Sequence, residues 1–234
     1  MEIKGTAIIV GAGGIGQAIS QKISESYINL DPILCGKGSN KNIDIKLDVT
    51  NDNSLIDFSK QLLEIKKPIR LFINTVGILH SENLSPEKRL ANISRNNLIE
   101  SFSVNAFTPI LLAKHIEKFI SKDNYFNFAS ISARVGSIAD NKTGGWYSYR
   151  SAKTAQNQLL KTLSLEWKRK YPKTIVTILH PGTVNTNLSK PFQSFVKPDK
   201  LFTTEFAANC ILKNIFNQTK SGKFIAWDGS EIPW

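Results

Sequence analysis

The feature that most constrains how this chain folds is a glycine-rich turn near its amino terminus. The turn reads Gly11-Ala12-Gly13-Gly14-Ile15-Gly16 and lies between the apolar run Ala7-Ile8-Ile9-Val10 and an amphipathic stretch. Glycine lets the backbone turn tightly and approach a phosphate, and the amino terminus of a following helix attracts negative charge. This placement predicts a dinucleotide-binding βα unit whose pyrophosphate contacts come from the turn; the alternative is a plain strand-to-helix turn.

The rest of the chain repeats the alternation of short β-branched runs and longer amphipathic stretches. The predicted strands are Thr6–Val10, Pro32–Cys35, Ile43–Leu47, Ile69–Asn74, Tyr125–Ile131, Thr174–Leu179 and Phe224–Trp227. The predicted helices are Ile15–Ser26, Ser54–Ile65, Asn96–Phe102, Ala106–Ile120, Tyr149–Lys170 and Glu205–Phe216. Strands that are apolar without alternation indicate a sheet covered on both faces. We expect an α/β fold, a Rossmann-type doubly wound sheet of about seven mostly parallel strands flanked by helices, forming one domain over residues 1–234.

Charge and cysteine content argue against several other classes of protein. The net charge is +11, but the lysines are scattered and no basic run is interleaved with aromatic residues. This pattern favours solvated helix faces over a nucleic-acid-binding surface. Cys35 and Cys210 are far apart and have no histidines at ligand spacing, so we expect neither a disulfide scaffold nor a metal site. No apolar run approaches the roughly 20 residues of a membrane span, and Met1 leads into a strand, so we expect a cytoplasmic protein without membrane contact.

The end of the second predicted strand bears on which nicotinamide dinucleotide would bind. It reads Cys35-Gly36-Lys37-Gly38-Ser39, with no carboxylate to bind the ribose 2′-hydroxyl of NAD. Lys37 could neutralise a 2′-phosphate and Ser39 could form a hydrogen bond to it, which favours NADP over NAD. The alternative is that Lys37 is an ordinary loop lysine.

Two further segments follow predicted strands, Asp48-Val49-Thr50 after the third and Asn74-Thr75-Val76-Gly77 after the fourth. The carboxyl ends of parallel strands line the ligand crevice, so both segments are expected to face a cofactor. Asp48 could accept a hydrogen bond from an adenine amino group. Alternatively, it belongs to the amino-terminal cap of the next helix.

The strongest motif is Tyr149-Arg150-Ser151-Ala152-Lys153. A tyrosine and a lysine four residues apart share one face of a helix. A phenol has a pKa near 10, and a neighbouring ammonium favours the phenolate and lowers that pKa. The pair therefore predicts a proton donor or acceptor, Tyr149, tuned by Lys153.

Taken together and in their order along the chain, these motifs resemble those of the short-chain dehydrogenase/reductase family. The resemblance covers nearly the whole chain. The set is completed by Val104-Asn105-Ala106, Ser132 and Pro181-Gly182-Thr183-Val184-Asn185-Thr186. The stretches 132–138 and 144–150 look most similar to the C-factor branch of that family.

The resemblance implies a role for each motif. Tyr149 would give or take the substrate proton, and Lys153 would bind the nicotinamide ribose and depress the pKa of the tyrosine. Asn105 would hold a water that passes protons to Lys153, and Ser132 would form a hydrogen bond to the substrate oxygen. Residues 181–186, among them Pro181, Gly182, Val184 and Thr186, would hold the nicotinamide carboxamide. Relatives usually form dimers or tetramers through helices equivalent to 106–120 and 149–170.

The sequence departs from the family pattern in three places. The glycine turn is one residue shorter than usual, and Thr75-Val76-Gly77 replaces the usual residues of the fourth-strand motif. Counting back from Gly136 puts Ala133 at the register of the catalytic serine. We assign Ser132, allowing one extra loop residue, with Ser130 as the alternative.

The remaining aromatic and histidine residues carry weaker signals. Phe192, Phe195 and Phe202 fall in a region, residues 183–203, that is expected to form a substrate lid. Trp146 and Trp227 are expected to pack the pocket wall and the sheet. His80, His115 and His180 are isolated and read as surface or core residues.

These observations favour an oxidoreductase that moves a hydride between NADP and a small-molecule carbonyl or alcohol. The alternative is a non-catalytic nucleotide-sensing or signalling protein on the same fold, since a fold does not determine a function. The joint presence of Asn105, Tyr149 and Lys153 favours the enzyme, because a sensor needs only the nucleotide-binding residues and not these catalytic ones.

Overall fold

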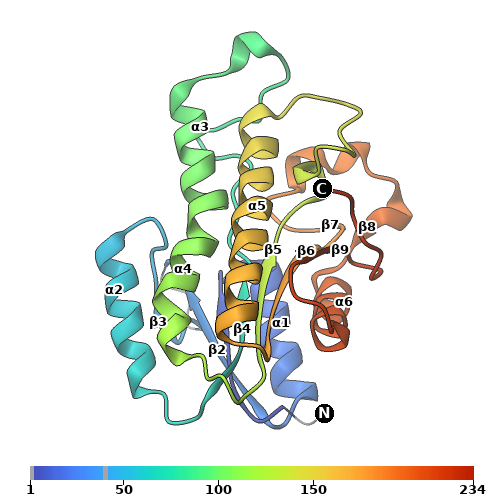
Figure 1. Ribbon diagram of the computed structural model, residues 1–234. Helices are drawn as coiled ribbons and strands as arrows, with labels where there is room; N and C mark the ends of the chain where they lie inside the picture. Colours follow the sequence, from blue (N-terminus) through green and yellow to red (C-terminus); the bar gives the residue numbers. More distant parts are fainter. Residues whose placement is uncertain (1–2, 39–41) are drawn as a thin grey trace.

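The computed structural model describes residues 3–38 and 42–234 and shows one seven-stranded sheet between two layers of helices (Figure 1). The strands run in the order β3-β2-β1-β4-β5-β6-β9, and every neighbouring pair is parallel. They are β1 Gly5–Val10, β2 Leu30–Gly36, β3 Ile45–Lys46, β4 Ile69–Asn74, β5 Phe126–Ile131, β6 Thr174–His180 and β9 Lys223–Ala226. The predicted doubly wound parallel sheet is confirmed.

Six α-helices belong to the described chain, and they divide between the two faces of the sheet. They are α1 Gly14–Ser26, α2 Asp52–Gln61, α3 Arg95–Phe102, α4 Thr108–Ile116, α5 Tyr147–Lys170 and α6 Thr204–Asn217. One core cluster joins the sheet to α2, α4 and α5, and the other joins it to α1 and α6.

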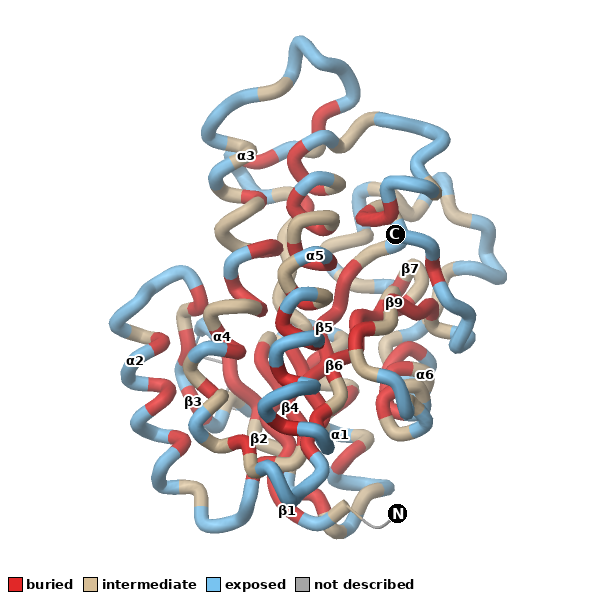
Figure 2. The backbone as a smooth tube through the Cα atoms, viewed as in Figure 1, coloured by how far each residue is buried: buried red, intermediate tan, exposed pale blue. Residues whose placement is uncertain are grey.

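The first strand shows why an unalternating apolar run suits this architecture. All six residues of β1 are buried. Because successive side chains of a strand point to opposite faces, Ile8 and Val10 pack into the cluster with α2, α4 and α5, while Ala7 and Ile9 pack against α1 and α6. Figure 2 shows the consequence, a buried sheet inside partly exposed helices.

The predicted elements all exist, and the differences are local. The helix predicted over 106–120 is preceded by a π-helical turn, Ser103–Phe107, which joins α3 to α4. Within this turn, the side-chain Nδ2 of Asn105 donates a hydrogen bond to the carbonyl of Ser101, four residues earlier (3.0 Å). A two-stranded parallel sheet was not predicted; it pairs β7 Thr183–Val184 with β8 Leu201–Phe202.

The parallel arrangement brings the carboxyl ends of all seven strands to one edge of the sheet. The segments that the sequence analysis singled out follow β1, β2, β3, β4, β5 and β6, so they share this edge. Within the described residues, no helix is both long enough and apolar enough to cross a membrane.

Candidate active site

A cavity of about 630 Å³ opens at the carboxyl edge, and Tyr149, Lys153 and Ser132 lie on its wall. Helix α5 supplies the first two residues one turn apart, and the third directly follows β5. Pro181 and Gly182, directly after β6, line another side of the same cavity.

Tyr149 and Lys153 are both buried, at 8% and 2% exposure, and the Lys153 Nζ lies 5.8 Å from the centre of the tyrosine ring. The Nζ donates to the Ile131 carbonyl (3.1 Å) and to Gln156 Oε1 (2.9 Å). Burial disfavours both charged forms, so it raises the pKa of Tyr149 and lowers the pKa of Lys153 to about 7. The expected lowering of the tyrosine pKa by its lysine is therefore not what the protein chain alone produces, because desolvation dominates.

The two candidate serines lie in different surroundings. Ser130 is fully buried within β5, where its hydroxyl accepts from Asn74 Nδ2 and Gln156 Nε2, both at 2.9 Å. Ser132 faces the cavity, and its hydroxyl donates to Asn157 Oδ1 at 2.6 Å. Of the two, only Ser132 shares the cavity wall with Tyr149.

Asn105 lies behind the cavity, in the π-helical turn. Its amide donates to the Ile78 carbonyl (2.9 Å), and its Oδ1 accepts from the Ile78 N–H (3.1 Å). A Cβ placed on Gly77 would lie 3.3 Å from Asn105 Oδ1 and 3.6 Å from Lys153 Nζ. The fold thus brings the ends of the Asn105 and Lys153 side chains close to Gly77. Because glycine has no Cβ, the space between these two side chains stays free of protein atoms from position 77.

A second cavity of about 390 Å³ shares Thr75, Val76 and Gly77 with the first and extends along the edge towards β2 and β3. Lys37 and Asp48 line it and form an ion pair at 2.8 Å. Hydrogen bonds from Lys37 and Thr50 hold the pKa of Asp48 at about 2. Asn51, not Asp48, caps helix α2, because its side chain accepts from the Ser54 N–H. Ser39 lies outside the described residues.

The glycine turn lies where the two cavities approach the amino terminus of α1. Helix α1 has no side-chain cap and no acidic residue in its first turn, and a Cβ on Gly13 would have no protein atom within 4 Å. At Gly16 a Cβ would lie 1.8 Å from the Gly11 carbonyl oxygen, so only glycine allows strand and helix to approach this closely. An uncapped helix terminus beside open glycine backbone fits the pyrophosphate of a nicotinamide dinucleotide.

Most of the other predicted cofactor residues also line these cavities. Gly11, Gly13 and Val49 lie on the smaller one, and Ile15, Val184 and Thr186 on the larger one. The structure does not place Gly14, Gly16, Asn74 or Asn105 on either wall. Gly14 lies close to the side chains of Thr186 and Thr204, and the Asn74 side chain joins Ser130 to the Val76 N–H.

The predicted lid region, residues 183–203, covers one side of the larger cavity with short helical turns and β7. Phe192, Phe195 and Leu188 line the cavity, and the Phe192 ring lies 5.0 Å from that of Trp146. Phe202 instead packs against Trp227, with ring centres 4.7 Å apart. The cavity wall near Tyr149 is thus largely aromatic and aliphatic.

Several residues at the site were not singled out from the sequence. Gln156 and Asn157 hold Lys153 and Ser132, and both are polar residues on the buried face of α5, a pattern that could have indicated them. His180, expected in a surface or core role, lines the cavity with its Nδ1 buried and unpartnered among described atoms, and burial lowers its pKa to about 4. Glu87, which forms hydrogen bonds with Ser148 at the start of α5, belongs to no motif or periodic pattern that could have indicated it.

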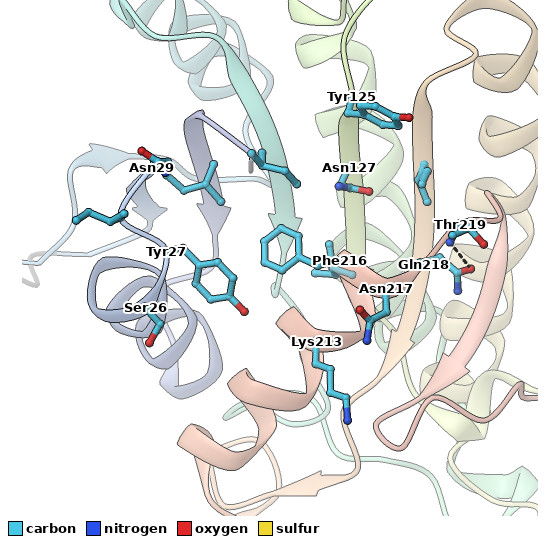
Figure 3. Close-up of a pocket in the computed structure, with 15 residues that line it drawn as sticks. Ser26, Tyr27, Asn29, Tyr125, Asn127, Lys213, Phe216, Asn217, Gln218 and Thr219 are labelled. Carbon is cyan, nitrogen blue, oxygen red and sulfur yellow. Dashed lines mark hydrogen bonds between the residues drawn. The ribbon is translucent and has the colours of Figure 1, made fainter. Parts of the chain in front are cut away.

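Figure 3 shows a different cavity, of about 780 Å³, at the opposite edge, where the strands begin. Tyr27, Asn127 and Phe216 point into it. It is larger than the cavity around Tyr149, but it holds none of the candidate site residues. Size alone therefore does not identify the chemically equipped pocket.

Comparison with known proteins identifies the family of the chain. The family model described as short chain dehydrogenase matches residues 5–197. The chain belongs to the short-chain dehydrogenase family. This is a family of oxidoreductases that use nicotinamide cofactors.

Individual relatives of this short-chain dehydrogenase cover most or all of the chain. C-signal of Myxococcus xanthus is 28% identical over 71% of this chain and 93% of its own length. The 1-hydroxy-2-glutathionyl-2-methyl-3-butene dehydrogenase of a Rhodococcus species is 25% identical over 98% and 99%. The NADPH-bound carbonyl reductase from chicken fatty liver is 22% identical, covers 99% of this chain and all of its own, and superimposes with a TM-score of 0.82, a likeness of fold.

Proposed function

We propose that this short-chain dehydrogenase is an NADP-dependent enzyme that reduces a small-molecule carbonyl or oxidises the corresponding alcohol. The observation that carries the proposal is the convergence of Tyr149, Lys153 and Ser132 on one cavity wall, beside an open glycine turn. A binding protein has no need for a buried phenol and a buried amine beside each other.

Each of the chain's residues has a definite task in this proposal. The cofactor, when bound, supplies or accepts the hydride. Tyr149 donates its hydroxyl proton to the carbonyl oxygen during reduction, or takes the proton back during oxidation. Ser132 turns its hydroxyl proton from Asn157 to that oxygen and holds it by a hydrogen bond, and the Lys153 ammonium stabilises the phenolate that remains. Lys153 then passes a proton to the phenolate and regains one through a water that Asn105 would hold.

The preference for NADP rests on the charge at the end of the smaller cavity. The Lys37 side chain is exposed and its ammonium pairs with Asp48, and no second carboxylate lies on that cavity wall among the described residues. The relative with bound NADPH has the same fold. The 2′-phosphate would then either displace Asp48 from Lys37 or share the lysine with it.

The substrate and the assembly follow from the surfaces around the site. Trp146, Phe192 and Phe195 favour a substrate with apolar surface, covered by residues 183–203 acting as a lid.

We also propose a homo-oligomer, a dimer or tetramer, formed through the layer of α3, α4 and α5. Ile99, Phe107 and Leu165 expose apolar side chains there.

The test is consumption of NADPH and of NADH with a panel of aldehydes, ketones and quinones, with Tyr149→Phe measured alongside. We expect turnover with NADPH and a loss of about 100-fold or more in Tyr149→Phe, since only the proton donor is removed. Cofactor binding should remain. Normal turnover by the variant would contradict the mechanism.

The second candidate is a nucleotide-sensing or signalling protein. The observation in its favour is the similarity to a relative named C-signal. Tight NADPH binding without turnover on any member of the panel would support this candidate against the enzyme.

A further inference from the structure

Glu87 is a buried carboxylate to which the proposed reaction gives no task. It lies on the segment between β4 and α3 and is 2% exposed. It takes part in none of the ion pairs among the described residues. A buried carboxylate without a cation is expensive unless hydrogen bonds satisfy it, so the partners of Glu87 indicate its role.

Those partners are at the start of α5, 61 residues away along the chain. Glu87 Oε2 accepts from the Ser148 N–H at 3.1 Å, and Oε1 accepts from the Ser148 hydroxyl. The Glu87 carbonyl accepts from the Trp146 N–H. Helix α5 has no cap from its own flanking residue, Trp146. Glu87 therefore supplies the cap, and its charge also suits the positive end of the helix dipole.

The cap also holds an unusual backbone conformation. Trp146 has φ +51°, the left-handed region, and it is the only residue other than glycine with positive φ in the described chain. Bulky residues rarely adopt this conformation unless surrounding contacts hold them. Its ring lies 6.2 Å from Tyr149 and 5.0 Å from Phe192 of the lid region. The left-handed turn thus sets the wall beside the reactive phenol.

The hydrogen bonds continue from the cap to Asn105. The Ser101 hydroxyl donates to the Ser148 carbonyl (3.1 Å), and Asn105 Nδ2 donates to the Ser101 carbonyl (3.0 Å). Glu87, Ser148, Ser101 and Asn105 are each no more than 2% exposed. One buried polar network therefore joins the start of α5 to the π-helical turn.

We propose that Glu87 is a positioning residue of the active site, acting through Ser148 and Trp146 on Tyr149 and through Ser101 on Asn105. This inference rests on the proposed function. Glu87 lines neither the cavity around Tyr149 nor the smaller one; its hydrogen bonds fix the first turn of α5, and hence where the Tyr149 hydroxyl lies relative to Ser132.

Glu87→Ala removes the cap, and Glu82→Ala, at an exposed glutamate on the same segment, is the matched control. We expect kcat for carbonyl reduction to fall roughly 100-fold in E87A, because a displacement of about 1 Å has that effect on a reacting group. The NADPH dissociation constant and the kcat of E82A should stay near wild type. Glu87→Gln, which keeps an acceptor for the Ser148 N–H, should recover most of the lost kcat.

Two further measurements separate positioning from general stability. Amide hydrogen exchange in residues 146–153 should become faster in E87A even without substrate. In a Tyr149→Phe background, E87A should cause no further loss of residual turnover, since Glu87 acts through Tyr149. If E87A does not fold, Ser148→Ala removes one of the same bonds, and the same pattern of kcat and exchange is expected in weaker form.

Three results would overturn the inference. They are a kcat of E87A that falls only with the folded fraction, an equal loss in the Tyr149→Phe background, and unchanged exchange in residues 146–153. A wild-type chain without turnover would instead contradict the proposed function and the catalytic part of this inference. The exchange measurement would then still decide whether Glu87 holds the start of α5.

Discussion

At the scale of single residues, the site is governed by burial. Lys153 has two hydrogen-bond acceptors but no carboxylate partner, so its ammonium loses hydration without gaining an opposite charge. Tyr149, beside it, is held in its neutral form by the same low-polarity surroundings. The protein chain thus keeps a neutral phenol ready as a proton donor.

The lowered lysine pKa has a consequence for stability. With a pKa of about 7 when folded and an ordinary value of 10.5 when unfolded, Lys153 binds more protons in the unfolded state between these values. The free energy of unfolding should therefore rise with pH from about 7 upwards, by at most about 1.4 kcal/mol per pH unit from this group. Urea unfolding of the cofactor-free protein at pH 7 to 8.5 measures this slope, and Lys153→Met should lack that contribution. Equal slopes in both proteins would contradict it.

Lys37 gives a prediction about cofactor choice. Replacing it with glutamine removes a charge-assisted bond to a 2′-phosphate, so the NADPH dissociation constant should rise about 10-fold. The NADH constant should change much less. Titration of both cofactors measures the two constants, with Lys46→Gln, an exposed lysine near the same strand ends, as the control. An equal change in the dissociation constants of NADH and NADPH would mean that Lys37 does not bind the 2′-phosphate.

At the scale of elements, the glycine turn separates two requirements. Gly16 is needed for strand β1 and helix α1 to approach, whereas a Cβ on Gly13 meets no protein atom within 4 Å. Gly13→Ala should keep the melting temperature close to wild type, with a loss of at most about 1 kcal/mol, but weaken NADPH binding. Gly16→Ala should lower the melting temperature clearly. Thermal unfolding and cofactor titration distinguish the two, and normal cofactor affinity in Gly13→Ala would argue against pyrophosphate binding at the turn.

Helix α5 shows how an element joins several tasks. Its inner face carries Tyr149 and Lys153, followed one turn later by Gln156 and Asn157, which hold Lys153 and Ser132. Its outer face carries Leu165, which is 51% exposed. One helical period therefore serves the reaction on one side and leaves Leu165 exposed among polar residues on the other.

At the scale of the whole molecule, that outer surface predicts assembly. Ile99 of α3, Phe107 of the π-helical turn and Leu165 of α5 are exposed apolar residues. Light scattering should give a mass above that of one chain, and Leu165→Glu should reduce it, since a charge buried in an apolar interface is unfavourable. Leu63→Glu, at another exposed leucine, is the control. A monomeric wild-type protein would contradict the proposed oligomer.

The order and identity of the elements could be predicted from the sequence because they depend on local patterns. The short, β-branched apolar run before Gly11 indicates a strand covered on both faces, and the spacing of Tyr149 and Lys153 places them together on any helix. These features need no knowledge of distant residues. The carboxyl ends of the strands, the glycine turn and the tyrosine–lysine pair can accordingly be predicted from the sequence.

What only the tertiary structure decided is which distant residues meet. The choice between Ser132 and Ser130 as cavity residue depends on which face of the β5 end is open, and the pairing of Lys37 with Asp48 joins two strand ends. Glu87 reaches Ser148 across 61 residues of chain, and no period or motif encodes such a contact. Local sequence sets backbone preference and periodicity, whereas burial, and with it the pKa of Tyr149 and Lys153, exists only after the chain has packed.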